Sequence, residues 1–418
     1  MASRRFSRRR FLASSLGAGT AVALSPGIVG SATAGATRRA AAGGTPSPRY
    51  LPFYGRHQIG ILTPPPPSGL MAAFDVTAAN RDELREAFRA LTDEARRLMT
   101  GEPYEERDEA FPPLHAGTVG DRTPKADLSI VTALGASLFD DRYGLADRKP
   151  RELVQMPFFP NDRLDPARSH GDLLLSLSAD SPDVNIFALR QVMRVTRGEM
   201  TLRWMVEGFN RRSRPQPGKA PARNLMGFLD GTSNLDTSDD DLMRHYVWVA
   251  RDDPEPDWAT GGSYMAVRII RMFVEFWDRT PLAEQEAIIG RKKESGAPLD
   301  GKREADIPRF DKDPDGKITP LDAHIRLANP RTPETSNNLI LRRGVSYSRG
   351  FDDAGRLDQG LAFVSFQRSL ESGFIAVQRR LDGEPLEEYI QPEGGGFFFA
   401  LPGVRDRDDY YARELVEP

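Results

Sequence analysis

One histidine of this chain lies among residues that could hold an iron and a negatively charged group. His324 is followed by Arg326 and by the turn Asn329-Pro330-Arg331. Imidazole is a common iron ligand, and guanidinium groups pair with carboxylates through two parallel hydrogen bonds. We therefore interpret this stretch as the centre of a heme site, in which His324 binds the iron and the arginines bind carboxylates at the cofactor rim.

The alternative for His324 is an ordinary hydrogen-bonded polar residue. The chain has 5 histidines, and none forms the H-x-x-x-H or H-E-x-x-H pair that binds zinc. A histidine without such a partner usually has no catalytic role. The neighbouring arginines and the Asn-Pro turn, which fixes the backbone, favour the functional interpretation.

A second stretch offers a carboxylate on a tight turn. Asp230 lies between Gly227 and Gly231 at the end of a short apolar run, and Thr232 and Ser233 follow. Glycine lets a backbone approach a ligand closely. The same pattern also describes a common Asp-Gly turn, so this stretch alone leaves both interpretations open.

Residues 311–322 resemble a calcium-binding loop in part. Asp311, Asp313 and Asp315 match the first ligand positions of an EF-hand. The twelfth position is Asp322 instead of the bidentate Glu, and Pro320 stands where the exiting helix should begin. A solvated acidic loop is therefore favoured, and a calcium-regulated binding module is kept as an alternative function.

Composition limits the class of protein. The chain has 418 residues, of which 39% are hydrophobic and 28% charged, as in a globular enzyme of two domains. The absence of cysteine excludes disulfides, thiolate-ligated heme, iron–sulfur clusters and covalent C-x-x-C-H heme attachment. Nothing resembles the basic stripe of a nucleic-acid binder. Beyond the N-terminal region, no apolar run approaches the ~20 residues that cross a bilayer.

The N-terminus has the order of an export signal. Paired arginines at 8–10 precede Phe11-Leu12, a modestly apolar run at 16–29 and the small-residue site Ala32-Thr33-Ala34. We predict a twin-arginine signal peptide over 1–34 and a periplasmic, extracellular or envelope-associated protein. The alternative is a basic disordered tail. Twin-arginine export carries folded proteins, often with a cofactor already inserted.

The order of predicted elements favours an α+β fold of two ferredoxin-like modules, antiparallel sheets with peripheral helices. After a flexible lead over 35–54, the first module spans 55–215. Its helices are predicted from Asn80 to Gly101 and from Ser181-Pro182, the second with Ile186, Leu189 and Met193 facing inward. Its strands are predicted at 74–76, 128–134, 172–178 and 201–206.

The second module, over 216–418, repeats the order after a bridge rich in Pro, Gly and Arg at 211–223. Its helices are predicted at 280–290 and 370–381, and its strands at 264–273, 361–366 and 397–401. Long loops lie between these elements, above all over 291–340. No sequence repeat relates the halves, so the duplication is inferred from element order alone.

Three spaced motifs together resemble the dye-decolorizing (DyP-type) heme peroxidases. They are GFLDGTSN at 227–234, DAHIRLANPR at 322–331 and ILRRGVSYSRG at 340–350. The likeness continues through HQIGIL at 57–62, HGDLLLSLSAD at 170–180 and GEPLEEYIQPEGGGFFFALPG at 383–403. With the predicted signal peptide, it points to the exported branch sometimes called deferrochelatase/peroxidase.

The resemblance implies one non-covalent heme b per chain, held in the C-terminal module. It implies that His324 is the proximal iron ligand and that Asp230 and Arg342 are the distal acid and arginine. Glu388 matches a carboxylate that hydrogen-bonds the proximal imidazole, with Glu387 as the alternative. The positions that line the heme are Gly231, Thr232, Ser233, Asn329, Pro330, Arg331 and Arg342.

The implied activity is the reduction of hydrogen peroxide and the oxidation of dyes, phenols or porphyrins through a ferryl intermediate. The alternative is a deferrochelatase that releases iron from heme, with an iron-uptake system as its partner. The natural donor, the oligomeric state and surface radical residues are left undecided by the sequence.

Overall fold

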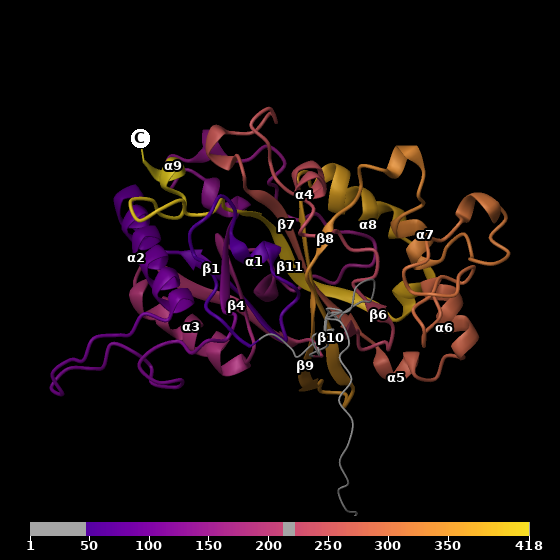
Figure 1. Ribbon diagram of the computed structural model, residues 1–418, viewed down its shortest axis with the longest axis horizontal. Coiled ribbons are helices and arrows are strands. Elements are labelled where there is room, and N and C mark those ends of the chain that lie inside the picture. The colour runs from indigo at the N-terminus through magenta and orange to yellow at the C-terminus, as the bar shows by residue number, and fades with distance from the viewer. Residues whose placement is uncertain (1–46, 212–221, 418) are drawn as a thin grey trace, which may run out of the picture. The chain divides into compact units, whose positions relative to one another are not determined.

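The computed structural model describes residues 47–211 and 222–417 (Figure 1). The predicted signal peptide over 1–34 and most of the predicted lead lie outside the described residues. So does the predicted boundary between 215 and 216. These divisions of the chain stay predictions. Within the described ranges, no helix combines the length and apolar character needed to cross a membrane.

The first half of the chain forms a ferredoxin-like module, as predicted. Its strands follow the spatial order β2-β3-β1-β4, and all neighbours are antiparallel. A helix follows β1 and another follows β3, which gives the β-α-β-β-α-β order of that module. Its main elements are β1 (Ser68–Val76), α2 (Arg81–Thr100), β2 (Ser129–Gly135), β3 (Leu173–Ala179), α3 (Pro182–Val195) and β4 (Met200–Phe209). The short helix α1 (Ile59–Leu62) precedes them.

The second half repeats this topology with longer insertions. Its strands follow the order β11-β7-β10-β9, which corresponds strand by strand to the first module. These strands are β7 (Ser263–Met272), β9 (Val345–Phe351), β10 (Leu357–Gln367) and β11 (Ile390–Ala400). The prediction of two ferredoxin-like modules is confirmed. Strand β9 was not predicted, because its run Val-Ser-Tyr-Ser-Arg-Gly-Phe carries few of the apolar residues that mark a strand.

The second half also has short elements before, between and after its main strands. They are β5 (Ala222–Arg223), β6 (Leu229–Asp230), α4 (Asp240–Tyr246), α5 (Val274–Trp277), α6 (Leu282–Ile289), α7 (His324–Ala328), β8 (Leu341–Arg342), α8 (Ala376–Leu381) and α9 (Arg413–Val416). A π-helical turn, Glu371–Ile375, leads into α8. Helices α6, α7 and α8 gather at the end of the molecule away from α2 and α3 (Figure 1).

The two modules share one sheet. Strand β11 pairs with β2 through Phe399 and Leu134, and β4 meets β9 at Phe209 and Ser346. The additional pairing of β7 with β10 closes the nine-stranded sheet. Pairing around a closed sheet leaves few free strand edges, which otherwise attract other chains.

Alternate residues of the strands enter two different cores. Phe74 of β1 and Leu175 of β3 pack with Phe88 of α2 in the core beneath the helices. Their neighbours Ala73 and Leu174 face the other side and join a second core. That second core also receives residues of β7, β10 and β11. A strand buried on both faces explains the continuous apolar run of β3.

Helix α2 begins and ends where its sequence predicts. The side chain of Asn80 accepts a hydrogen bond from the Glu83 amide at 2.9 Å, which satisfies a free N–H of the first turn. Gly101 ends the helix in the left-handed region with φ 68°. Its large apolar residues are buried, among them Leu84, Leu91 and Leu98.

The inward face of α3 differs from its prediction. Ile186 and Met193 are exposed, at 37% and 38%, and only Leu189 of the predicted three is buried. Phe187 and Val192 are buried instead. The apolar residues of this helix form two stripes, and periodicity alone does not decide which of them faces the sheet. The large ring of Phe187 buries more apolar area against the sheet than Ile186 would.

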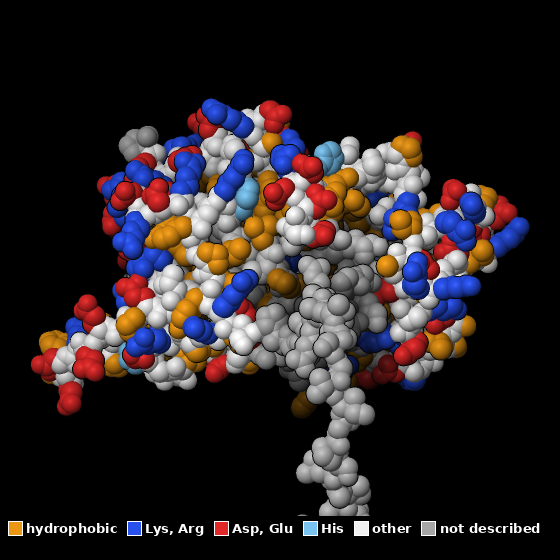
Figure 2. All heavy atoms as spheres, viewed as in Figure 1, with side chains coloured by type: hydrophobic (Ala, Val, Ile, Leu, Met, Phe, Trp, Pro, Cys, Tyr) orange, Lys and Arg blue, Asp and Glu red, His pale blue; other side chains and the backbone are white. Residues whose placement is uncertain are grey.

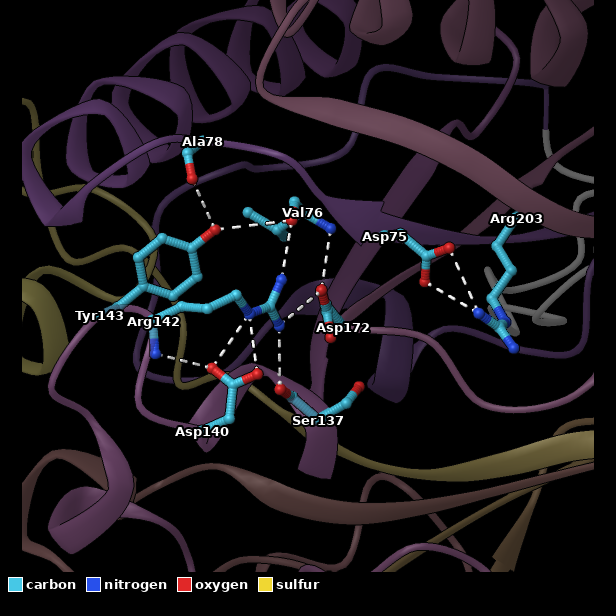
Figure 3. Close-up of polar contacts among 9 residues, drawn as sticks. All are labelled: Asp75, Val76, Ala78, Ser137, Asp140, Arg142, Tyr143, Asp172 and Arg203. Atoms are coloured by element: carbon cyan, nitrogen blue, oxygen red, sulfur yellow. Dashed lines mark hydrogen bonds and ion pairs between the residues drawn. The ribbon is translucent and has the colours of Figure 1, made fainter.

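A polar network joins loops of the first module to its strands (Figure 3). The carboxylate of Asp172, at the start of β3, accepts hydrogen bonds from the Val76 amide at 2.9 Å and from Arg142 at 3.0 Å. Arg142 also donates to the Val76 carbonyl at 2.9 Å and binds Asp140. Asp172 thus fixes the end of β1 against the loop that carries Arg142.

Charged side chains of both signs are interspersed over the surface (Figure 2). On the face shown, Lys and Arg do not gather into a stripe of the kind that binds a nucleic-acid backbone.

Candidate active site

Most of the predicted site residues line one cavity of about 490 Å³, whose wall comes mainly from the second half of the chain. Of the predicted residues, those lining it are Asp230, Gly231, Thr232, Ser233, His324, Asn329, Arg331 and Arg342. Pro330, Arg326 and Glu388 do not line it. Much of the remaining wall is apolar, with Phe228, Ile270, Met272, Leu361 and Phe363 among its residues.

His324 is the first residue of helix α7 and presents its ring to the cavity. Its Nδ1 lies 2.8 Å from Oε2 and 3.1 Å from Oε1 of Glu384. Burial disfavours the imidazolium, but the Glu384 carboxylate outweighs burial and raises the pKa of His324. Because Nδ1 is held by Glu384, Nε2 is the ring nitrogen left for a ligand. A carboxylate behind a histidine orients the ring and makes it a stronger metal ligand.

The partner of His324 is therefore Glu384, and the prediction of Glu388 for this position is wrong. Glu384 is 5% exposed and follows Gly383, whose φ of 83° turns the chain toward α7. Glu388 lies one helical turn later and is exposed. Glu387 lines the cavity without bonding His324. The sequence contained one usable signal. Glu384 lies between Gly383 and Pro385, two residues that fix the course of the backbone, and Glu388 has no such neighbours.

Asp230 and Arg342 lie side by side on another part of the wall. A guanidinium nitrogen of Arg342 is 3.4 Å from Oδ1 of Asp230, and a second donates to the Thr232 carbonyl at 2.9 Å. Both side chains are about one-third exposed toward the cavity, 33% and 31%. Gly231, with φ 96°, makes the turn that brings Asp230 and Thr232 to the same guanidinium.

Asn234 fixes this pair in place. Its carboxamide accepts from the Arg342 amide at 2.9 Å and donates to the Arg342 carbonyl at 2.8 Å. The side chain thus pairs with β8 as a neighbouring strand would. The GFLDGTSN motif contains Asn234, but its role becomes visible only when β8 lies beside it.

Two further arginines form a positive region around Ser233. Arg331 and Arg291 each approach the Ser233 hydroxyl at 3.5 Å. Burial lowers the pKa of Arg291 to about 10, and the charge of Arg331 adds to this. Partial burial also lowers the pKa of Arg331, which has no carboxylate ion pair among the described residues. Arg291 was not among the predicted site residues, because a lone Arg after the helix-ending Gly290 belongs to no motif.

The backbone around this positive region is unusual. Ser233 and Arg331 both adopt left-handed conformations, with φ 59° and 62°. Such conformations cost non-glycine residues about 1 kcal/mol or more and cluster at ligand sites. Both residues thereby point toward the same end of the cavity.

Arg326 is used differently from its prediction. Its guanidinium donates to the carbonyls of Thr319 and Asp313, each at 2.8 Å, and not to a group in the cavity. It ties α7 to the acidic loop. The prediction that Arg326 binds the rim of a cofactor is therefore wrong, because the loop 313–319 folds back over this side chain.

The acidic loop is closed by its own backbone. Amide groups of Lys317, Ile318 and Thr319 donate to the Asp313 carboxylate at 2.8–3.2 Å and hold the pKa of Asp313 below its usual range. Between residues 47 and 417, apart from 212–221, no group of three acidic, His or Cys side chains is placed to hold a metal ion. The EF-hand alternative finds no support in this geometry.

These residues fit a heme. His324 offers one unoccupied ring nitrogen beside a carboxylate, as an axial ligand requires. Apolar side chains such as Phe363 and Met272 form walls suited to a porphyrin, and Arg331 on the cavity wall suits a propionate. Asp230 and Arg342 add a proton acceptor and a fixed cation on the same cavity.

Comparison with known families supports this fit. Residues 58–210 match the family described as Dyp-type peroxidase, N-terminal, and residues 221–405 match Dyp-type peroxidase, C-terminal. Together the two matches extend over most of the described chain.

Individual proteins are similar over nearly the whole length. The deferrochelatase of Escherichia coli (strain K12) is 49% identical over 367 residues, 87% of this chain and 87% of that protein. A crystal structure of a DyP-type peroxidase from Streptomyces coelicolor is 37% identical, with a TM-score of 0.79 over 89% of this chain and 98% of that one. Ferric DtpA from Streptomyces lividans is 36% identical, with a TM-score of 0.80 and the same shares.

Proposed function

This chain belongs to the DyP-type peroxidase family of heme enzymes, and from that premise we propose that His324 is the iron ligand and Asp230 with Arg342 the peroxide-activating pair. The observation that carries the proposal is that these residues line one cavity. Glu384 holds one ring nitrogen of His324, and Asp230 and Arg342 contact each other on another part of the cavity wall. Arg331 and Arg291 would bind the propionates.

When bound, the heme supplies the redox centre at which peroxide is reduced and from which donors are oxidised one electron at a time. Asp230 can accept a proton from one oxygen of hydrogen peroxide and return it to the other, so that water can leave. Arg342 is always cationic and stabilises the negative charge that develops on the departing oxygen.

Glu384 acts from behind His324. Its carboxylate accepts a hydrogen bond from the Nδ1–H group of His324 and makes the imidazole more anionic, which stabilises oxidised iron. The Thr232 carbonyl and Asn234 restrict the position of Arg342, so its charge stays close to Asp230. Such preorganisation lowers the cost of arranging these groups during the reaction.

The first test uses spectra and peroxide reactivity. Wild type loaded with heme is expected to show a Soret band, and His324→Ala to lose it or shift it. Asp230→Asn and Arg342→Leu are expected to keep the band and to respond to peroxide at least about a hundredfold more slowly. Stopped-flow traces in which both variants respond as fast as wild type would reject the distal assignment.

A second candidate function is iron release from heme, which the name of the Escherichia coli relative supports. Incubation with heme and a reductant would then yield metal-free protoporphyrin, detected by fluorescence. Robust donor oxidation without this product would leave peroxidase activity as the function.

We also propose export by the twin-arginine route, on the basis of the arginines at 8–10 and the Ala32-Thr33-Ala34 site. Replacing Arg8 and Arg9 with Lys is expected to keep the protein in the cytoplasmic fraction. Unchanged export of that variant would contradict the route.

Dyes and phenols are the proposed electron donors of the peroxidase reaction.

A further inference from the structure

The helix that carries His324 is too short to hold itself in place. Helix α7 spans His324–Ala328, and no side chain caps its N-terminus. An isolated helix of this length is unstable in water. The direction of His324 must therefore come from contacts that other segments make with α7.

One segment of the chain grips both ends of this helix. At the first residue of α7, Glu384 bonds Nδ1 of His324. At the last turn, Arg380 donates from Nε to the Leu327 carbonyl at 3.0 Å and from a terminal nitrogen to the Ala328 carbonyl at 3.1 Å. Only Gly383, with φ 83°, and two other residues separate these two contacts in sequence.

The Arg380 contacts suit the chemistry of a helix end. The last carbonyls of a helix lack intrahelical partners and carry partial negative charge, which a cation stabilises. Arg380 is partly buried, and burial lowers its pKa. Its planar fork reaches two carbonyls at once, which a Lys ammonium on a flexible stem cannot reproduce with the same geometry.

Arg380 also connects α7 to the strand of Arg342. Its third nitrogen donates to Oδ1 of Asn338 at 2.7 Å, and Asn338 in turn donates to the Ser372 carbonyl at 2.6 Å. Asn338 lies shortly before β8 (Leu341–Arg342). One guanidinium thus links the His324 helix, the approach to Arg342 and the π-helical turn before α8.

We propose that Arg380 is a positioning residue for the proximal ligand: it holds the C-terminal end of α7 while Glu384 holds the other, so that His324 keeps one direction toward the cavity. The inference rests on the proposed function of His324. Arg380 itself makes no chemical step.

The test compares Arg380→Met with Arg379→Met in the heme-loaded protein. Arg379 is the preceding residue of α8, is 61% exposed and pairs with Glu371 on the surface, so its replacement is a matched control. Arg380→Met keeps length and apolar packing but removes all three donated bonds. The measurements are the Fe–His stretching band of the reduced protein by resonance Raman spectroscopy and the rate of heme transfer to an acceptor apoprotein.

Arg380→Met is expected to broaden or split the Fe–His band and to speed heme loss roughly tenfold, since two charge-assisted bonds to α7 are lost. Arg380→Lys should fall between it and wild type, and Arg379→Met should match wild type. A band and rate for Arg380→Met equal to those of Arg379→Met would overturn the inference while the proposed function stands.

Two further outcomes are decisive. If neither wild type nor Arg379→Met binds heme through His324, the proposed function is overturned, and this inference falls with it. If Arg380→Met does not fold, Arg380→Lys carries the test, and a Lys variant with an unchanged band and unchanged heme loss overturns the inference.

Discussion

At the scale of single residues, the site depends on how each charged side chain is held. His324 has a carboxylate behind it, and Arg342 is held by Asp230, Thr232 and Asn234. Arg331, in contrast, lines the cavity and has no carboxylate ion pair among the described residues. The contacts of His324 and Arg342 fix their geometry, and the charge of Arg331 remains for an anionic ligand.

The charge of Glu384 is expected to set the redox potential of the bound iron. Glu384→Gln keeps a hydrogen-bond acceptor near Nδ1 but removes the negative charge, so the oxidised iron is stabilised less. We expect the midpoint potential of the ferric/ferrous couple to rise by on the order of 59 mV, the step of one tenfold change for one electron. Spectroelectrochemical titration measures it.

Glu388→Gln is the control for this substitution, because Glu388 is exposed and lies outside the cavity. Its potential should equal that of wild type. If Glu388→Gln shifted the potential and Glu384→Gln did not, the structural assignment of the partner of His324 would be wrong.

At the scale of elements, strands and helices bring distant residues to one cavity. Asp230 comes from β6, His324 from α7 and Arg342 from β8. Among these, only β8 is anchored in the main sheet, through pairing with β10. Strand β6 pairs with the short strand β5 outside the main sheet, and α7 is held by side-chain contacts. Substitutions here should alter the site without unfolding the protein.

In the first module, Asp172 is expected to contribute to stability and not to the site. Asp172→Ala removes the acceptor of the Val76 amide and of Arg142, and leaves a buried N–H without a partner (Figure 3). We expect the free energy of unfolding to fall by about 2 kcal/mol. Chemical denaturation measures this loss, and the Soret band of the folded protein should not change.

Asp75→Ala is the matched control, because Asp75 is a neighbouring carboxylate that forms an exposed ion pair (Figure 3). Asp75 pairs with Arg203 at 3.2 Å, with side-chain exposures of 46% and 33%. Surface pairs of this kind contribute roughly 0–1 kcal/mol. An equal loss of stability in both variants would show that burial of Asp172 is not the cause.

At the scale of the whole molecule, the closed sheet makes the two modules one folding unit. The core that contains Ala73 and Leu174 of the first module also contains Val267 and Val364 of the second. Neither module can keep that core dry alone. The two ferredoxin-like modules predicted from the sequence are present, and the structure adds that their strands join into one sheet.

The stability of the whole protein is expected to depend on pH through Glu94 of α2. Glu94 is 5% exposed, and burial raises its pKa despite the hydrogen bond from Tyr104. The folded state therefore binds this proton more tightly than the unfolded chain does. Its contribution to stability is present at low pH and is lost as pH rises from about 4.3, the ordinary value for Glu, through the raised value.

Glu94→Gln should remove this dependence while it keeps an acceptor for Tyr104. The melting temperature of the variant minus that of wild type is expected to increase between about pH 4 and about pH 7. Calorimetry at fixed ionic strength measures it. Glu86→Gln on the same helix, 68% exposed, should parallel wild type. A constant difference for Glu94→Gln would contradict the assignment.

Local features of the fold were predictable because their causes are local. The cap at Asn80, the stop at Gly101 and the doubly buried run of β3 each follow from neighbouring residues. The element order also predicted the ferredoxin-like topology. The face of α3 was wrong at Ile186 and Met193, because periodicity does not say which of two apolar stripes meets the sheet.

The sequence by itself determined the residue types of the site and the family, since His324, Asp230 and Arg342 lie in motifs that can be read along the chain. Only the tertiary structure decided which charges meet. Glu384 replaced Glu388 because a left-handed glycine turns the chain there, and Arg326 turned away because a loop folded over it. Hydrogen bonds between residues 60 or more positions apart depend on packing, which no local pattern encodes.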